Sequence, residues 1–132
     1  MSDNPGVHFE MPYEDAARVA GFYKTAFDWD MAEMGEQMGN YITAGTAETD
    51  EDRMVKTPGT INGGFYPLDS APQSPEPSVV ISVNDIEQAM ANIKKAGGEV
   101  LGKPVEIPGI GLYASFKDTE GNRASILEAK RG

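Results

Sequence analysis

The sequence predicts an α+β fold made of two tandem βαβββ modules, and a repeated strand-to-helix pattern carries this prediction. A strand-like segment over residues 7–11 precedes an amphipathic helix over about 15–27, and a second pair covers residues 78–83 and 85–96. In both helices the apolar residues recur every three or four positions, which is the spacing of one buried helix face. The cap and the apolar face recur with the same offset, from Asp15 to Asp85, and this register indicates an internal repeat.

The ends of the predicted helices and the segment between the halves define the modules. Asp15 and Asp85 stand where a carboxylate accepts hydrogen bonds from the free amides of a first helical turn. Gln88 follows Asp85 at the spacing of a capping box, and Gly97-Gly98 end the second helix. Residues 71–77 are rich in proline and predict an extended linker. We therefore expect a single domain over 1–132, with one module over about 5–70 and another over about 78–130.

Strand-like segments complete each half. In the first half they lie around residues 31–34, 40–43 and 60–66, and in the second around 100–101, 111–116 and 123–128. Alternation along the first strand places Phe9 and Met11 against the helix and turns His8 and Glu10 to the other face. The same reasoning places Val79, Ile81 and Val83 against the second helix and turns Ser78, Val80 and Ser82 away from it.

Composition limits the possible functions. The 132 residues include 11 basic and 21 acidic side chains, a net charge of −10, and no cysteine. This charge disfavours nucleic acid and anionic membranes as partners, and the absence of cysteine excludes disulfides, thiol catalysis and cysteine-ligated metals. No apolar run is long enough for a membrane span, and the first residues lack a signal-peptide core. We expect a cytoplasmic protein. His8 is the only histidine, so it alone could supply an imidazole.

Six segments, in order along the chain, resemble the vicinal oxygen chelate superfamily, which includes glyoxalase I, extradiol dioxygenases and bleomycin-resistance proteins. They are residues 7–10, 22–29, 61–64, 83–89, 96–98 and 116–122, the last reading Phe-Lys-Asp-Thr-Glu-Gly-Asn. The resemblance implies that the two modules form curled mixed sheets around a concave cavity, with the helices outside. It also implies a homodimer.

The resemblance places metal ligands of the metal-dependent members on the first and last strand of each half. Here these positions fall on His8, on Ser78, on Ser125, and on Asn62 or Gly63, between which spacing cannot choose. Serine hydroxyls and amides are poor ligands for divalent transition ions without a charged partner. Glu128 lies an odd number of residues beyond Ser125, so an unbulged strand turns it to the opposite face. We therefore expect no cofactor, a divalent metal included.

The favoured function is a metal-free small-molecule-binding protein of the glyoxalase/bleomycin-resistance type, with an organic ligand in the cavity between the modules. The candidate ligand-binding residues are His8, Glu10, Asn62, Ser78, Ser82, Tyr113 and Ser125. The alternative is a glyoxalase-like lyase or isomerase, or a dioxygenase-related enzyme, using His8 and Glu10 with or without a weakly held divalent metal. The sequence does not identify the ligand.

Overall fold

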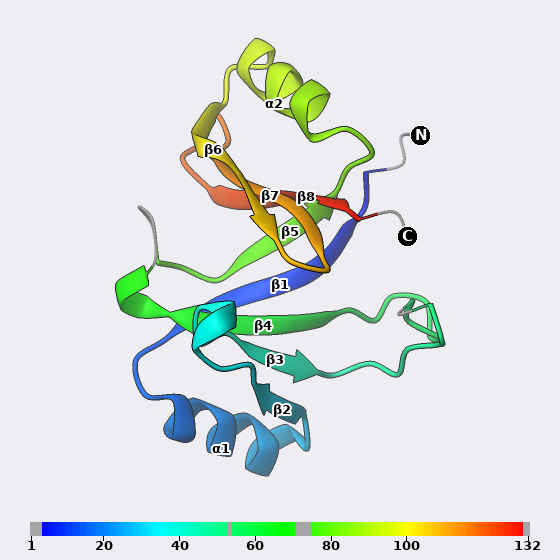
Figure 1. Cartoon of the computed structure of the whole chain (residues 1–132), viewed down its shortest axis with the longest axis vertical. Coiled ribbons are helices and arrows are strands. Elements are labelled where there is room, and N and C mark those ends of the chain that lie inside the picture. The colour runs from blue at the N-terminus through cyan, green and yellow to red at the C-terminus, as the bar shows by residue number, and fades with distance from the viewer. Residues whose placement is uncertain (1–3, 53, 71–74, 131–132) are drawn as a thin grey trace. The chain divides into compact units, whose positions relative to one another are not determined.

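The computed structural model describes residues 4–52, 54–70 and 75–130, and its elements follow the predicted order (Figure 1). The first half contains β1 (Gly6–Tyr13), α1 (Ala16–Phe27), β2 (Asp30–Glu33), the short 3-10 helix η1 (Glu36–Met38), β3 (Ile42–Gly45), β4 (Asn62–Pro67) and the 3-10 helix η2 (Leu68–Ser70). The second contains β5 (Ser78–Ser82), α2 (Ile86–Lys95), β6 (Glu99–Ile107), β7 (Gly111–Lys117) and β8 (Arg123–Ala129). Of the predicted linker, residues 71–74 lie outside the described residues.

The chain divides into two compact units, one of residues 8–77 and one of residues 78–132 together with the N-terminal segment up to Val7. The strand order is β2-β3-β4-β1 in the first module and β5-β8-β7-β6 in the second. β1 pairs with β4 in parallel, as β5 does with β8, and the remaining pairs within each module are antiparallel. Both modules are thus βαβββ units with mixed sheets, and the predicted fold class is confirmed.

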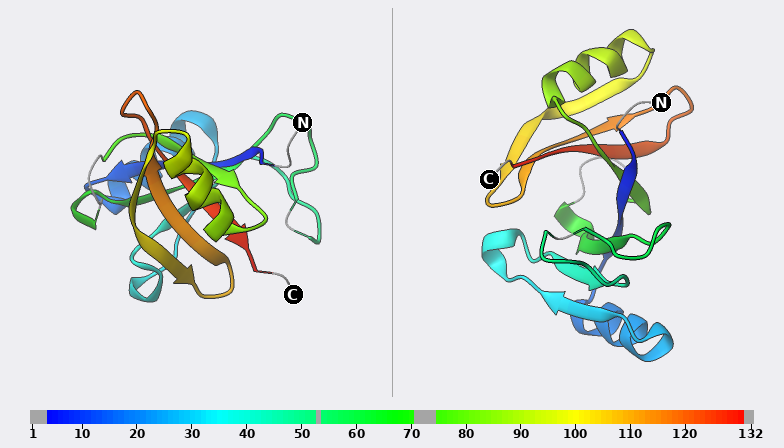
Figure 2. Two further views of the ribbon diagram at one scale, coloured as in Figure 1. Left: turned by 90° about the horizontal axis from the view of Figure 1, so that it is seen from above. Right: turned by 90° about the vertical axis from the view of Figure 1, so that its right-hand side faces the viewer.

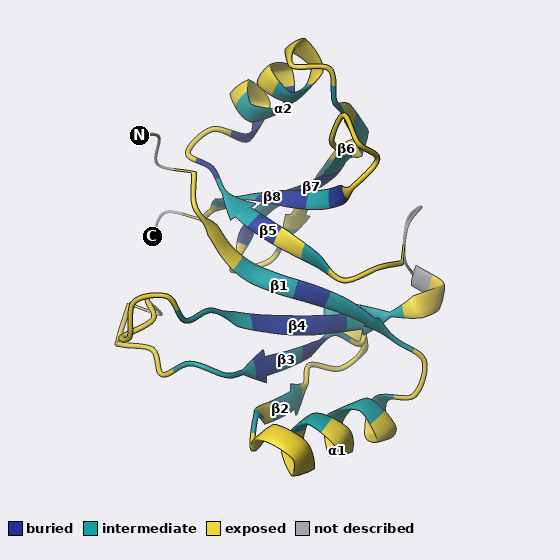
Figure 3. Ribbon diagram, turned by 180° about the vertical axis from the view of Figure 1, so that it is seen from behind, coloured by how far each residue is buried: buried dark blue, intermediate teal, exposed yellow. Residues whose placement is uncertain are grey.

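The core of the first module packs residues of α1 against the sheet, and the ribbon coloured by burial shows buried residues along β3 and β4 (Figure 3). The Asp15 carboxylate caps the helix by accepting from the Arg18 amide at 3.0 Å. Ile42, Ala44 and Phe65 are the most buried apolar residues here, and Phe65 is only 1% exposed. The partly buried hydrophobic side chains packed against them are those of Phe9, Met11, Tyr13, Ala16, Val19, Tyr23, Trp29 and Met31. Phe9 and Met11 therefore face the helix, as the alternation predicts.

In the second module α2 covers one face of its sheet, which Figure 2 shows from two further sides. Ile86 and Met90 from the helix pack with Val83, Ala114 and Ile126 from the strands. Ile81 packs against this core, but Val79 is 48% exposed, so its predicted helix contact is wrong. Val79 lies near the start of β5, before the strand reaches the core residues that α2 covers.

Two side chains bind backbone amides in the first turn of α2. Asp85 accepts from the Gln88 amide at 3.1 Å, as predicted. The Gln88 side chain donates instead to Asn92, one turn further along, so the structure contains a simple aspartate cap in place of the predicted capping box. Glu128 reaches from β8 and accepts from the Ile86 amide at 2.9 Å. Its carboxylate is therefore on the helix side of the sheet, as predicted.

Candidate functional site

Three polar side chains meet on the face of the first sheet that turns away from α1. His8 and Glu10 lie two residues apart on β1 and share this face. Tyr41, just before β3, places its hydroxyl 3.0 Å from His8 Nε2 and donates to Glu10 Oε2 at 3.0 Å. Glu10 is buried, whereas His8 and Tyr41 are of intermediate exposure. We call this chain of hydrogen bonds the His8–Tyr41–Glu10 relay.

The Gly63-Gly64 pair on β4 makes room for rings on both faces of the sheet. A Cβ atom on Gly64 would overlap the Tyr41 ring on the relay face. A Cβ atom on Gly63 would overlap the Phe9 ring on the helix face. Both glycines are therefore required by close approach of an aromatic ring, which is one established use of glycine within a strand.

The surroundings of His8 favour its neutral form. Burial lowers the pKa of the imidazole from its ordinary value of 6.5, and the negative charge of Glu10 opposes part of this shift. Burial is the larger of the two effects on the pKa, because the protonated ring loses the stabilisation that water gives its charge. Among the described residues His8 forms no other hydrogen bond.

The second module carries a different polar cluster on the corresponding face of its sheet. Ser125 is completely buried, and its hydroxyl lies 2.7 Å from the Tyr113 hydroxyl and 3.1 Å from the Ser115 hydroxyl. We call these three residues the hydroxyl cluster. Nearby, the buried Arg123 donates to the Ser78 hydroxyl at 3.3 Å. Two of the predicted residues, Tyr113 and Ser125, are thus brought into direct contact.

Two other predicted residues have different surroundings. Asn62 pairs with His8 across β1 and β4, but its side-chain oxygen accepts from the Thr46 and Ala47 amides at 2.8 and 2.7 Å. Asn62 therefore stabilises the start of the loop that follows β3. Ser82 lies on the same face as Ser125, because the paired residues Val80 and Ser125 share a face and Ser82 follows Val80 by two positions. Ser82 also receives a backbone contact, with its amide donating to Pro5.

The strand register resolves which residue of β4 corresponds to Ser125. Ser125 pairs with Val80 in β5, and Val80 is the repeat counterpart of Glu10, which pairs with Gly64. Gly64, and neither Asn62 nor Gly63, therefore occupies the β4 position that is equivalent to Ser125. Gly63 faces the helix, and Gly64 has no side chain with which to bind a ligand.

Register also identifies Tyr41, which sequence reasoning did not include among the site residues. Gly64 pairs with Thr43, and Ser125 pairs with Ser115. Two residues before each partner stands a tyrosine, Tyr41 in one module and Tyr113 in the other. Tyr41 is thus the repeat counterpart of the predicted residue Tyr113. This equivalence becomes visible only when the pairing of β3 with β4 is known.

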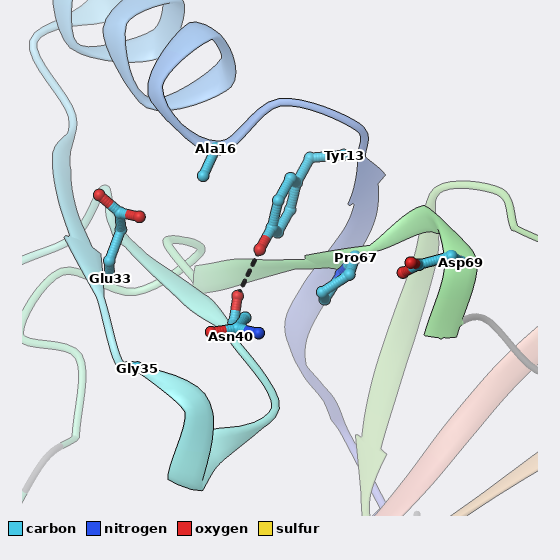
Figure 4. Close-up of a pocket in the computed structure, with 7 residues that line it drawn as sticks. All are labelled: Tyr13, Ala16, Glu33, Gly35, Asn40, Pro67 and Asp69. Atoms are coloured by element: carbon cyan, nitrogen blue, oxygen red, sulfur yellow. Dashed lines mark hydrogen bonds between the residues drawn. The ribbon is translucent and has the colours of Figure 1, made fainter.

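A hollow of about 280 Å³ lies in the first module near the start of α1 (Figure 4). Tyr13 projects into it and donates to the Asn40 carbonyl at 2.6 Å, with Glu33 and Asp69 on either side. Burial raises the pKa of the Tyr13 hydroxyl, and the two carboxylates add to the increase. The Tyr13 hydroxyl thus stabilises the segment between η1 and β3. The hollow is lined by none of the predicted site residues.

The model of the glyoxalase/bleomycin resistance protein/dioxygenase superfamily matches residues 7–126. The chain belongs to this superfamily. No curated protein sequence matches it significantly. None of the helices in the described ranges is long and apolar enough to cross a membrane.

Three solved structures with different descriptions share the fold. A Streptomyces coelicolor methylmalonyl-CoA epimerase variant in complex with 2-nitronate-propionyl-CoA is 14% identical, with a TM-score of 0.70 over 98% of this chain and 100% of that chain. A hypothetical protein from Bacillus halodurans C-125 is 17% identical, with a TM-score of 0.68 over 99% and 98%. A chain described as NAD-dependent benzaldehyde dehydrogenase from Legionella pneumophila is 12% identical, with a TM-score of 0.63 over 93% and 98%. At these identities the likeness concerns the fold, which does not determine the chemistry.

Of the residues at the metal-ligand positions that the resemblance implies, only His8 has a side chain that transition ions prefer. His8 supplies one imidazole, but Ser78 lies beside the Arg123 guanidinium, and the Ser125 hydroxyl is engaged by two other hydroxyls. The fourth position is Gly64. Transition ions prefer imidazole or carboxylate donors at most positions. In the described part of the chain, no three His, Asp or Glu side chains are grouped so as to hold a metal.

Proposed function

We propose that this chain binds a small organic molecule on the sheet face that carries the His8–Tyr41–Glu10 relay, and that binding needs no resident metal ion. The relay is the observation that carries the proposal. It places an imidazole, a phenol and a carboxylate together on a face that α1 does not cover. A small number of convergent polar groups that fix a ligand's orientation is one feature of small-molecule sites.

Charge indicates which ligands to test first. The net charge of −10 attracts cations and repels anions over long range. Glu10 adds a buried carboxylate within the relay itself. Tyr41 and the half-buried His8 also offer ring surface to a flat ligand. Cationic and aromatic compounds are therefore the first class to screen.

Metal independence rests on the donor set. In the first module one imidazole stands with a glycine, and in the second a serine lies beside an arginine, so neither module brings together the imidazole and carboxylate donors that transition ions prefer. The Glu10 carboxylate lies near His8, but it already accepts from Tyr41. A ligand held by hydrogen bonds and ring contacts fits these residues better than one held through a metal.

One feature supports a second candidate function, a glyoxalase-like isomerase or lyase. The relay connects an imidazole to a carboxylate through a phenol, and such a chain can move a proton to or from a bound substrate. In that case His8 and Glu10 would be the acid–base pair. His8→Ala would then abolish turnover while the circular dichroism spectrum stays unchanged. Full activity in that variant would refute this mechanism.

The binding proposal is tested by thermal melts of chelator-treated protein against cationic and aromatic compounds. A specific ligand should raise the melting temperature in proportion to the logarithm of its concentration once above the dissociation constant, by roughly 10 °C at a hundred times that constant. Tyr41→Phe should lose most of that increase. Tyr23→Phe is the matched control, because it removes a phenol hydroxyl on the helix side of the same sheet, where the hydroxyl contacts the Met11 sulfur. Equal loss in both variants would contradict a site at the relay.

Metal independence is tested in the same assay with Ni²⁺, Co²⁺, Zn²⁺, Mn²⁺ and Fe²⁺. We expect none of them to raise the melting temperature at micromolar concentration. If one ion stabilises the chain and His8→Ala does not respond to it, the metal-free proposal is wrong. Isomerase, lyase and dioxygenase assays with that ion would then come first.

A further inference from the structure

The hydrogen bonds of the relay determine where the His8 proton lies. The Tyr41 hydroxyl has a single proton, and it donates this proton to Glu10, because a carboxylate can only accept. Toward His8 the phenol oxygen must then act as an acceptor. The bond at 3.0 Å between this oxygen and His8 Nε2 therefore requires a proton on Nε2. In a neutral imidazole this leaves the lone pair on Nδ1.

Nδ1 is the nitrogen that a ligand can reach. His8 forms no hydrogen bond besides the one to Tyr41 among the described residues. In the same part of the chain, no buried side-chain nitrogen or oxygen lacks a partner. An Nδ1 atom without a partner is therefore accessible to solvent. Burial, which lowers the pKa of the ring, keeps this nitrogen an acceptor at neutral pH.

We infer that Tyr41 is a positioning residue that holds His8 in the Nε2–H tautomer, so that the site selects ligands whose polar group donates a hydrogen bond. Hydroxyl and ammonium groups can donate to Nδ1. An ether, an ester or a carboxylate can only accept, and it would face the lone pair unpaired. This inference rests on the proposed binding function and specifies the chemistry of the ligand.

Two features of the fold hold Tyr41 in this position. Gly64 leaves the space beneath the ring, since a Cβ atom there would overlap it. The buried Glu10 accepts the phenol proton from the same strand that carries His8. The Tyr41 hydroxyl donates toward Glu10 because a carboxylate can only accept. Replacing this carboxylate therefore allows the hydroxyl to donate to His8 instead.

The tautomer is measured by long-range ¹⁵N–¹H correlation spectroscopy on the ¹⁵N-labelled full chain. His8 is the only histidine, so its ring signals need no further assignment. We expect Nε2 to be protonated and Nδ1 unprotonated near pH 7.5. Tyr41→Phe and Glu10→Gln should each shift the ring toward a mixture of tautomers, because the first removes the acceptor and the second lets the phenol donate to His8. Tyr23→Phe should leave the spectrum unchanged. A proton on Nδ1 in the wild type would overturn the inference.

Ligand selection is measured with phenol and anisole, two uncharged probes that differ in whether the oxygen can donate. Phenol should shift the Nδ1 resonance saturably and bind about tenfold or more tightly than anisole. Benzoate, added at 0.5 M salt to screen long-range repulsion, should bind as weakly as anisole. Equal binding of phenol and anisole overturns the selectivity. If no probe or library compound binds, the proposed function fails as well, while the free-protein spectrum decides the tautomer separately.

Discussion

The close approach of Tyr41 to Gly64 makes Gly64→Ala the sharpest test of the relay's geometry. A methyl group at this position would overlap the tyrosine ring, so the ring must move. Overpacking of this kind costs about 1–3 kcal/mol. Gly64 does not have a positive φ, so alanine fits the backbone and returns about 0.4–1 kcal/mol by restricting the unfolded chain. We expect a net loss of about 1–2 kcal/mol in the free energy of unfolding.

Urea unfolding followed by the fluorescence of Trp29, the only tryptophan, measures this loss. A typical urea dependence converts it to a midpoint lower by roughly 0.5–1 M. The decisive control is Gly64→Ala in a Tyr41→Ala background, where the obstructing ring is gone. There the substitution should be neutral or stabilise by up to about 1 kcal/mol. An equal loss in both backgrounds would refute the reasoning, because the cost would then arise from something other than the ring.

Three further predictions concern stability. Glu128→Gln should lower the free energy of unfolding by about 0.3–1 kcal/mol, since a carboxylate at the α2 N-terminus binds the Ile86 amide; urea midpoints check this, and no change would refute it. Phe65→Ala should cost about 3–5 kcal/mol, whereas Val105→Ala, at a residue 60% exposed, should stay within about 0.5; similar losses would contradict the assigned core. Burial lowers the pKa of His8 below its unfolded value of 6.5, so its contribution to the free energy of unfolding is fully present above about pH 6.5 and is lost as the pH falls. The urea midpoint should therefore decline more steeply toward about pH 5 in the wild type than in His8→Gln.

Local patterns were sufficient to predict the order of the elements. The spacing of apolar residues and the two aspartate caps placed both helices to within a residue or two, because these signals depend on residues close together in sequence. The failures occurred where distant residues compete. Gln88 bonds along the helix to Asn92, and Glu128 from β8 supplies the second carboxylate at the helix start. No local pattern contains that long-range contact.

The candidate site shows the same division. Alternation along β1 placed His8 and Glu10 on one face, which the structure confirms. The residue that connects them, Tyr41, comes from a different strand region, and its place between them follows only from the pairing of β3 with β4. Likewise Asn62 was a reasonable ligand by spacing, but its amide oxygen binds two backbone amides instead. Partners of polar side chains depend on tertiary contacts, and periodicity does not report them.

The repeat itself explains why the two modules carry different chemistry on equivalent positions. Tyr41 and Tyr113 stand at corresponding places, and each directs its hydroxyl over the neighbouring last strand of its own sheet. In the second module the residue beneath is Ser125, whose hydroxyl lies 2.7 Å from the Tyr113 hydroxyl. In the first it is Gly64, which has no side chain, so the phenol passes over it and reaches β1. The absence of a side chain at this register position thus lets the Tyr41 phenol join an imidazole to a carboxylate. The same glycine offers no donor atom from its side chain at the strand position where the resemblance implies a metal ligand, so the feature that builds the relay also supports the proposal that binding needs no metal.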